Sequence, residues 1–174
     1  IQMKTKIIWF TGLSGSGKTT LSRLLKGIIH KKNPKTKIKL LDGDQFRKKN
    51  KKNTFTKKSI IQNNLDIINY VSRIKNKYDF ILISVISPLI KTRKIAKNKF
   101  EKNYYEIYVK CPIKILILRD TKKLYKLALE KKLKNLIGFN SKIKYEKSDY
   151  KVLTVNTNIL SKKKSLDKII NYIF

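Results

Sequence analysis

Two groups of residues in this 174-residue chain have types and spacings suited to phosphate chemistry. The first is the stretch Gly12–Thr20, in which Gly12, Gly17, Lys18 and Thr19 match the pattern G-x-x-x-x-G-K-[ST]. Glycines let backbone N–H groups turn onto phosphate oxygens, and a helix that starts at such a loop adds a favourable dipole. Lys18 would reach the β- and γ-phosphates, and the Thr19 hydroxyl would bind Mg²⁺. The motif predicts a site for a nucleoside triphosphate.

The second group consists of Asp42 and Asp44, which flank Gly43 at the end of an apolar run. Carboxylates beside a phosphate loop can hold Mg²⁺, directly or through water, or accept a proton from an attacking hydroxyl. The alternative is an Asx-turn that ends a strand. Arg47 would face the same cleft and hold an anionic group of an acceptor, unless it is one more solvated charge among lysines.

Strands and helices that would position these residues alternate along the chain. We expect strands over Ile7–Thr11, Lys37–Leu41, Asp79–Ile86, Tyr104–Val109 and Val152–Val155. We expect helices over Lys18–His30, Lys57–Lys75, Leu89–Phe100, Ile113–Arg119, Leu124–Leu133 and Leu166–Ile173. This order predicts an α/β P-loop NTPase fold, with a five-stranded parallel sheet and helices on both faces. Ligands should lie at the carboxyl ends of the strands.

Length and composition favour one domain over residues 1–174, without repeats or linkers. Ile1 and Gln2 precede Met3 and look like a remnant of expression. The single cysteine, Cys111, excludes a disulfide framework and is expected to be a buried thiol. We expect no membrane association and a cytoplasmic location, because no apolar run is long enough for a membrane span and no secretory signal opens the chain.

Charge is the unusual feature of the composition. The chain has 43 Lys and Arg against 11 Asp and Glu, a formal net charge of +32. Such a surface suits nucleic-acid binding, and a non-catalytic nucleic-acid-associated P-loop protein is one alternative. AT-rich codon usage also explains the excess, since Lys, Ile, Asn, Tyr and Phe are all abundant. The lysines are spread from end to end without aromatic platforms, so we expect no nucleic-acid partner.

A basic segment, Arg119–Lys126, follows the fourth expected strand. Basic residues that reach over a phosphate site are typical of a lid, which neutralises transferring phosphate and excludes water. We expect this lid to span roughly residues 120–150. His30, the only histidine, is expected to lie on the surface near a helix end, without a role.

Taken together, these stretches resemble the adenylylsulfate kinase family. The matching residues follow the family's order over about residues 6–156: Gly12–Thr20, Leu41–Asp44, Arg47, Phe55-Thr56, Ile86–Pro88, Arg93, Arg119-Asp120, Leu124–Lys126, Gly138 and Tyr145-Glu146. The resemblance implies an ATP-dependent kinase that phosphorylates the ribose 3′-OH of a nucleotide with an anionic 5′ extension. Because members of the family often form homodimers, the resemblance also implies a homodimer as one of the possible assemblies of this chain.

The resemblance assigns roles by position. The ATP phosphates and Mg²⁺ would be held by Gly12, Leu13, Ser14, Gly15, Ser16, Gly17, Lys18, Thr19 and Thr20, with Thr19 on the metal. Catalysis would fall to Lys18, Asp42, Asp44 and Ser87. The acceptor nucleotide would be bound by Asp44, Arg47, Phe55, Asn63, Ile86, Ser87, Lys126 and Leu136. Ser87 matches a serine described in the family as a phosphoserine intermediate, and direct in-line transfer favours a binding role for it.

Three positions depart from the family's pattern, all on the acceptor side. Ile60 and Ile90 stand where the family has arginines, and Leu136 stands where it has an aromatic residue. Losing a charge-assisted contact typically costs about 1.5–3 kcal/mol, enough to redirect specificity. An alternative acceptor is therefore cytidine diphosphoramidate, which similar proteins of capsule-building bacteria use at the same hydroxyl. A kinase of small metabolites is a third hypothesis, disfavoured by Ser87-Pro88 and Arg119–Lys126.

Overall fold

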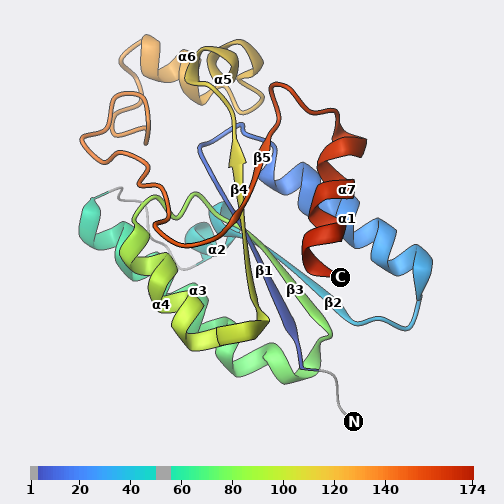
Figure 1. Cartoon of the computed structure of the whole chain (residues 1–174). Helices are drawn as coiled ribbons and strands as arrows, with labels where there is room; N and C mark the ends of the chain where they lie inside the picture. The colour runs from blue at the N-terminus through green and yellow to red at the C-terminus, as the bar shows by residue number, and fades with distance from the viewer. Residues whose placement is uncertain (1–3, 50–55) are drawn as a thin grey trace.

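The computed structural model describes residues 4–49 and 56–174 (Figure 1). Its centre is a sheet of parallel strands in the order β2-β3-β1-β4-β5. These strands are β1 (Lys6–Thr11), β2 (Ile38–Asp42), β3 (Phe80–Ser84), β4 (Tyr104–Lys110) and β5 (Leu153–Asn156). The predicted α/β fold with a five-stranded parallel sheet is confirmed.

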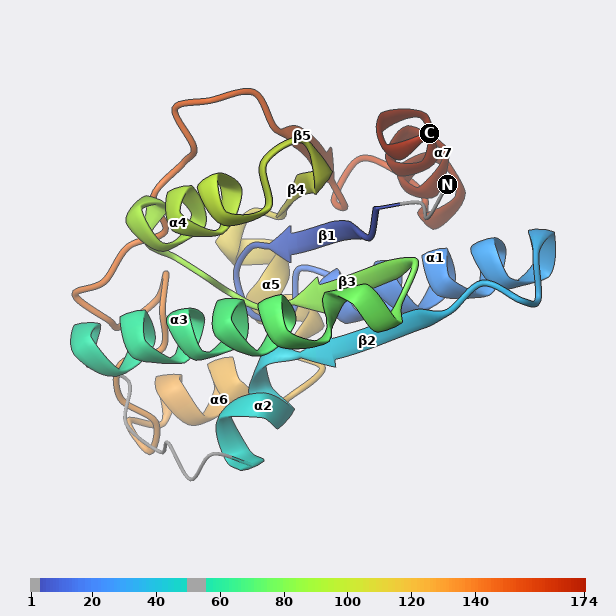
Figure 2. The ribbon, with the colours of Figure 1, turned by 90° about the horizontal axis from the view of Figure 1, so that it is seen from below.

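Helices cover both faces of the sheet (Figures 1 and 2). They are α1 (Lys18–Lys32), α2 (Gly43–Lys49), α3 (Lys57–Ile74), α4 (Ile90–Phe100), α5 (Ile113–Arg119), α6 (Leu124–Leu129) and α7 (Lys162–Ile173), with 3₁₀ turns at 75–77 and 101–103. Helices α1 and α7 lie on one face, and α3 and α4 lie on the other. No helix within the described ranges is long and apolar enough to cross a membrane.

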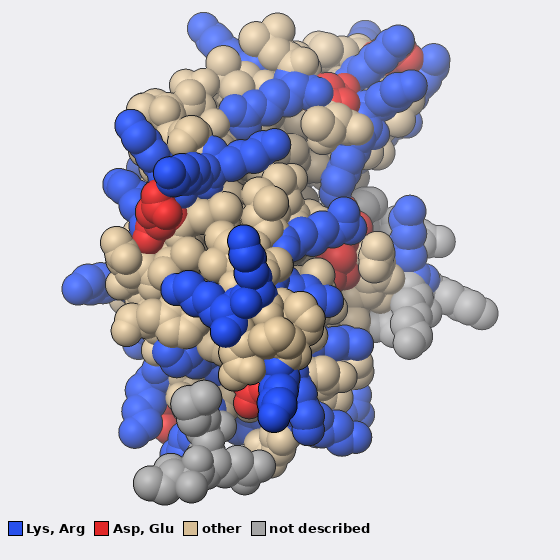
Figure 3. Space-filling view, turned by 90° about the vertical axis from the view of Figure 1, so that its right-hand side faces the viewer, with Lys and Arg blue, Asp and Glu red and all other residues tan. Residues whose placement is uncertain are grey.

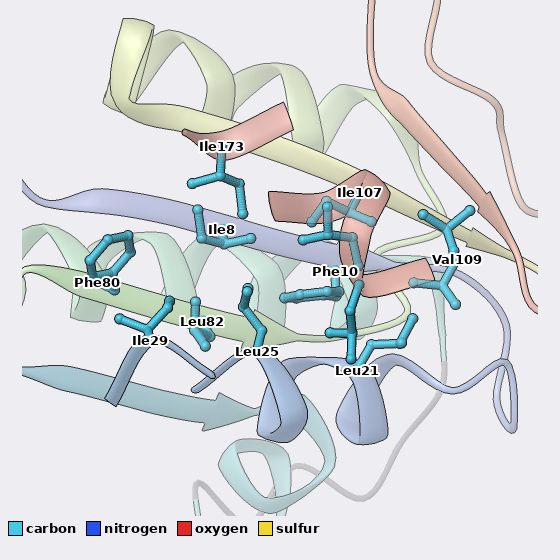
Figure 4. Close-up of a cluster of buried hydrophobic side chains, with 13 residues drawn as sticks. Ile8, Phe10, Leu21, Leu25, Ile29, Phe80, Leu82, Ile107, Val109 and Ile173 are labelled. Carbon is cyan, nitrogen blue, oxygen red and sulfur yellow. The ribbon is translucent and has the colours of Figure 1, made fainter. Parts of the chain in front are cut away.

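The central strand β1 is buried on both sides, because its alternate side chains enter two separate cores. Ile8 and Phe10 face α1 and α7, where they pack with Leu21, Leu25 and Ile173 among others (Figure 4). Ile7 and Trp9 face the opposite layer and pack with side chains of α3 and α4. Full burial of each large apolar side chain contributes about 1.5–3 kcal/mol, so the two cores hold β1 and the loop that follows it in place.

The chain after β2 differs from the prediction. The strand is shifted by one residue and includes Asp42, and the expected polar connection begins with the helix α2. Asp42 starts this helix, because its Oδ1 accepts the N–H groups of Asp44 at 3.0 Å and Gln45 at 3.3 Å. An aspartate before a helix is a common N-cap, so this signal was present in the sequence.

Three further helix predictions were wrong in their bounds. Helix α6 ends at Leu129, not at Leu133, because Lys131 adopts φ +58° and turns the chain away. Helix α7 begins at Lys162, not at Leu166, and the side chain of Ser161 caps it by accepting the N–H of Lys164. Lysines in a first turn oppose the helix dipole, so this segment carried a weak start signal. Helix α1 extends two residues beyond His30.

Candidate active site

The phosphate loop joins β1 to α1 at the carboxyl edge of the sheet. Gly12 has φ +141°, and a Cβ at this position would lie 2.4 Å from the carbonyl oxygen of Val109, so only glycine fits between the loop and β4. Within the loop, the Ser16 hydroxyl is buried and has no hydrogen-bond partner among the described residues. An unpartnered buried hydroxyl at a helix N-terminus is suited to an incoming phosphate oxygen.

Lys18 lies inside this loop. Its Nζ donates to the carbonyl oxygen of Leu13 at 2.7 Å, and the residue is only 9% exposed. Burial, assisted by the nearby positive charge of Lys122 and opposed by Asp44 and Asp42, lowers the pKa of Lys18 to about 7. Asp44 and Asp42 therefore compensate the ammonium charge only in part, and a bound phosphate would add further negative charge.

Binding of ATP should draw a proton onto Lys18. Because phosphate stabilises the ammonium form, the pKa of Lys18 rises on binding, and uptake approaches about one proton per site near pH 8. The affinity for ATP should accordingly fall as the pH rises above about 7. Calorimetry in buffers of different ionisation enthalpy measures this proton uptake. The Lys18→Met variant measures the protons that the ATP phosphates themselves take up or release on binding. Equal uptake by both proteins would contradict the assignment to Lys18.

Thr19 and Asp42 meet at the mouth of the loop. The Thr19 hydroxyl donates to Oδ2 of Asp42 at 3.0 Å, while Oδ1 of the same carboxylate caps α2. A hydroxyl and a carboxylate beside a triphosphate are a suitable donor set for Mg²⁺, which usually keeps several waters and takes few protein ligands. The residues present therefore fit this metal.

Asp44 lies across the cleft from the loop and pairs with Lys122, whose Nζ is 2.5 Å from Oδ2 of Asp44. Burial alone would raise the pKa of the Asp44 carboxyl, but the hydrogen bond and charge of Lys122, with the charges of Lys18 and Arg47, outweigh it and hold that pKa below its usual value. Asp44 is therefore a carboxylate at neutral pH. Arg47, which is half-buried, donates to the Ser59 hydroxyl at 3.3 Å.

Lys18, Thr19, Asp42, Asp44 and Lys122 line one cleft of about 420 Å³, whereas Arg47, which was expected to face it, is not part of the lining. Its walls are the loop residues 14–21, Asp42, Asp44, Ser84–Ile86, Arg119, Thr121 and Lys122, together with Thr157, Leu160, Lys162 and Ser165. The last four residues were missed from the sequence. Arg119 joins them to the loop, since it donates to Thr157 Oγ1 at 3.1 Å and to the Thr157 carbonyl at 2.7 Å, and Thr157 Oγ1 donates to the Ser16 carbonyl at 2.9 Å. No local motif marks this segment, because only the fold brings β5 beside the loop.

The residues expected to bind the acceptor lie in several environments. Ile86 lines the cleft, whereas Ser87 is 1% exposed with φ +42°, and its Oγ is 3.5 Å from that of Thr92. Asn63 is 1% exposed, and its Oδ1 has no partner among the described residues. Phe55 lies outside the described residues.

The expected lid packs on the phosphate loop. The Tyr125 hydroxyl donates to the Ser14 carbonyl at 2.8 Å, and Asp120 accepts the N–H groups of Tyr125 and Lys126. The Lys126 side chain is exposed and is absent from the residues that line the cleft, and Leu136 is buried in an apolar cluster with Tyr125. Cys111 is a buried free thiol in the same cluster, as predicted, and His30 is exposed in the last turn of α1.

Comparison with known proteins identifies the family. A family model described as adenylylsulphate kinase matches residues 4–156. The chain is 33% identical to the adenylyl-sulfate kinase of Clostridium acetobutylicum, over 99% of this chain and 85% of that protein. It is 31% identical to the adenylyl-sulfate kinase of Thermodesulfovibrio yellowstonii, over 98% of this chain and 84% of that protein. Among solved structures, the APS kinase of Mycobacterium tuberculosis in complex with AMPPNP and APS has the same fold, with a TM-score of 0.87 at 24% identity over 98% of both chains. This chain therefore belongs to the adenylylsulphate kinase family of ATP-dependent phosphotransferases.

Proposed function

We propose that this protein transfers the γ-phosphoryl group of ATP to the ribose 3′-OH of adenylyl sulfate. The observation that carries the proposal is the convergence of Lys18, Thr19, Asp42 and Asp44 in one cleft. This transfer needs from a protein a site for the phosphates of ATP, groups that hold a cation and a proton acceptor, all in the correct positions. The family's curated members with this name support the acceptor.

Each group has a distinct role in the proposed reaction. Residues Gly12–Thr20 hold the ATP phosphates through backbone N–H groups, Ser16 and Lys18. Thr19 and Asp42 would hold Mg²⁺, which would neutralise charge that develops on the phosphates. Asp44 accepts the proton of the 3′-hydroxyl. The oxygen of that hydroxyl forms a bond to the γ-phosphorus of ATP as the bond to ADP breaks and ADP leaves. Lys122 pairs with Asp44 and lines the same cleft, so its positive charge would also attract the phosphates of a bound nucleotide.

Cytidine diphosphoramidate is a second candidate acceptor, favoured by the surroundings of three residues. Ile60 is 1% exposed and packs with Leu89 and Ile137, so no cation stands at this position. Leu136 is 7% exposed within its apolar cluster and offers no aromatic ring. At Ile90 the side chain is aliphatic, and the backbone N–H donates to Glu146 at 2.8 Å. An acceptor that needs arginine contacts at these places would bind weakly.

A panel of acceptors tests the proposal. Wild-type protein is incubated with ATP, Mg²⁺ and either adenylyl sulfate or cytidine diphosphoramidate, and products are identified by mass spectrometry and ³¹P NMR. With adenylyl sulfate as the acceptor, we expect its 3′-phosphorylated form and one molecule of ADP, formed from ATP, for each molecule of product. Turnover of the cytidine compound alone would transfer the assignment to the second candidate. Absence of a 3′-phosphorylated product from both would overturn the function.

The positive charge of the surface suits a role in attracting these substrates. Lys and Arg side chains are spread over the face in Figure 3, with few acidic side chains between them. A positive field of this kind raises the encounter rate of anionic nucleotides without specific contacts.

A further inference from the structure

The segment Ile86–Pro88, here named the acceptor loop, is supported by hydrogen bonds to its backbone. Each of its three carbonyl groups accepts a hydrogen bond from a different part of the chain. The Ile86 oxygen accepts the Thr11 hydroxyl at 2.6 Å, the Ser87 oxygen accepts Nη1 of Arg93 at 2.5 Å, and the Pro88 oxygen accepts the N–H of Glu146 at 2.8 Å. These contacts hold Ser87 at φ +42°, a conformation that a serine rarely adopts without such support.

Arg93 is the centre of this support, and it is completely buried. Its Nε donates to Oε1 of Glu106 at 3.1 Å, and its Nη2 donates to the Glu146 carbonyl and, at 3.3 Å, to the Ser148 hydroxyl. Glu106, also buried, accepts three further hydroxyls, from Tyr104 at 3.0 Å, Tyr150 at 2.5 Å and Ser148 at 2.5 Å. A buried pair as well satisfied as this one fixes one arrangement of the chain more than it adds stability.

Tyr145 contacts the same support through its ring and its hydroxyl. Its ring stacks on Tyr108 with centroids 4.8 Å apart, and the Arg93 guanidinium lies 4.9 Å from its centroid. Thr11 has one hydroxyl proton, which goes to Ile86, so the Tyr145 hydroxyl is the donor in its 3.1 Å contact with Thr11. Burial raises the pKa of Tyr145, which keeps this hydroxyl protonated.

We propose that Arg93, Tyr145 and Glu146 form a latch that fastens the C-terminal end of the lid to the acceptor loop. The name latch covers these three residues. Through the latch, the position of the acceptor loop depends on the position of the segment 145–148. The latch residues are positioning residues, since they act on the acceptor through the backbone of Ile86–Pro88. The inference rests on the proposed function only in placing the acceptor at this loop.

Two mild variants test the latch, because Arg93 itself is buried and its loss would leave the buried Glu106 carboxylate without its cation. Tyr145→Phe removes one hydroxyl, and Glu146→Ala removes the carboxylate that accepts the Ile90 N–H. Asp149→Ala is the matched control, since this exposed carboxylate on the same segment also binds α4, through Lys94 at 2.6 Å, but farther along the helix from the acceptor loop than Ile90. Arg93→Lys keeps the charge and lacks the planar set of donors.

The first readout needs no substrate. Hydrogen–deuterium exchange should be faster at the amides of Ile86, Ser87, Leu89 and Ile90 in Tyr145→Phe and Glu146→Ala, and unchanged in Asp149→Ala. The second readout is kinetic. Both latch variants should raise the KM for the acceptor by about tenfold, as expected for one lost hydrogen bond, while kcat and the KM for ATP stay within about twofold.

The outcomes separate the latch from the proposed function. Unchanged exchange at residues 86–90 in both latch variants would overturn the latch, whatever the acceptor. Faster exchange with an unchanged acceptor KM would overturn its positioning role, as would an equal loss in the Asp149→Ala control. If wild-type protein phosphorylates neither acceptor, the proposed function fails, and the exchange experiment still decides whether the latch exists.

Discussion

Replacing Lys18 with methionine should reduce the kcat of phosphoryl transfer by about 10²–10³-fold. The ammonium group is the side-chain cation inside the phosphate loop, and removal of one preorganised donor to developing charge costs on the order of 10²–10³ in kcat. Because Lys18 also contributes to ATP binding, the loss in kcat/KM should be larger still. Steady-state kinetics with ATP and the acceptor identified above measures both effects.

The fold of the Lys18→Met variant should be intact, or slightly more stable than that of the wild type. Burial disfavours the charged form of Lys18, as its lowered pKa shows, and methionine occupies the same space without that cost. Lys26→Met is the matched control, because Lys26 is exposed on the same helix and should retain full activity. A Lys18→Met protein with near wild-type kcat, or a similar loss in Lys26→Met, would remove Lys18 from the catalytic site.

Replacing Asp44 with asparagine should lower kcat by about 10²–10⁴-fold, the range typical of a lost general base. Asparagine has the same shape and cannot accept the proton of the 3′-hydroxyl. ATP should bind at least as tightly as in the wild type, because the variant removes a negative charge near the phosphates and releases Lys122. The opposite effects on kcat and on ATP affinity distinguish this role from a general loss of structure.

Asp167→Asn provides the control for the Asp44 experiment. Asp167 is exposed on α7 and lies outside the cleft, so its substitution tests whether one fewer negative charge alone changes turnover. Turnover by Asp44→Asn at the wild-type rate across pH 5–9 would show that the carboxylate carries no proton in the reaction. In that case Asp42 would be the remaining carboxylate of the cleft lining.

The sheet and the phosphate loop were predictable because their signals are local. Buried parallel strands appear as continuous apolar runs, as in Phe80–Ser84, and the loop motif lies in nine consecutive residues. Helix α2 was missed because seven residues rich in charge resemble a polar connection. Its start depends on one side chain, Asp42, that also serves the cleft.

The rest of the site was beyond reach of local patterns, for a physical reason. Thr157 and Lys162 enter the cleft only because β5 is the outer strand beside β4, which a sequence motif does not encode. The pairing of Lys122 with Asp44 joins residues 78 positions apart. In a chain with 43 basic residues, nothing in the sequence distinguishes Lys122 from its neighbours.

Asp42 has a consequence for how such an enzyme can change its substrate. One carboxylate oxygen serves Thr19 on the donor side, and the other starts the helix that carries Asp44 and Arg47 on the acceptor side. A substitution at Asp42 would therefore disturb both halves of the reaction together. Positions 60, 90 and 136 lie away from this shared carboxylate, in other elements. Under the proposed function, exchanging those side chains would change the choice of acceptor and leave Thr19 and Asp42 on the donor side unaltered.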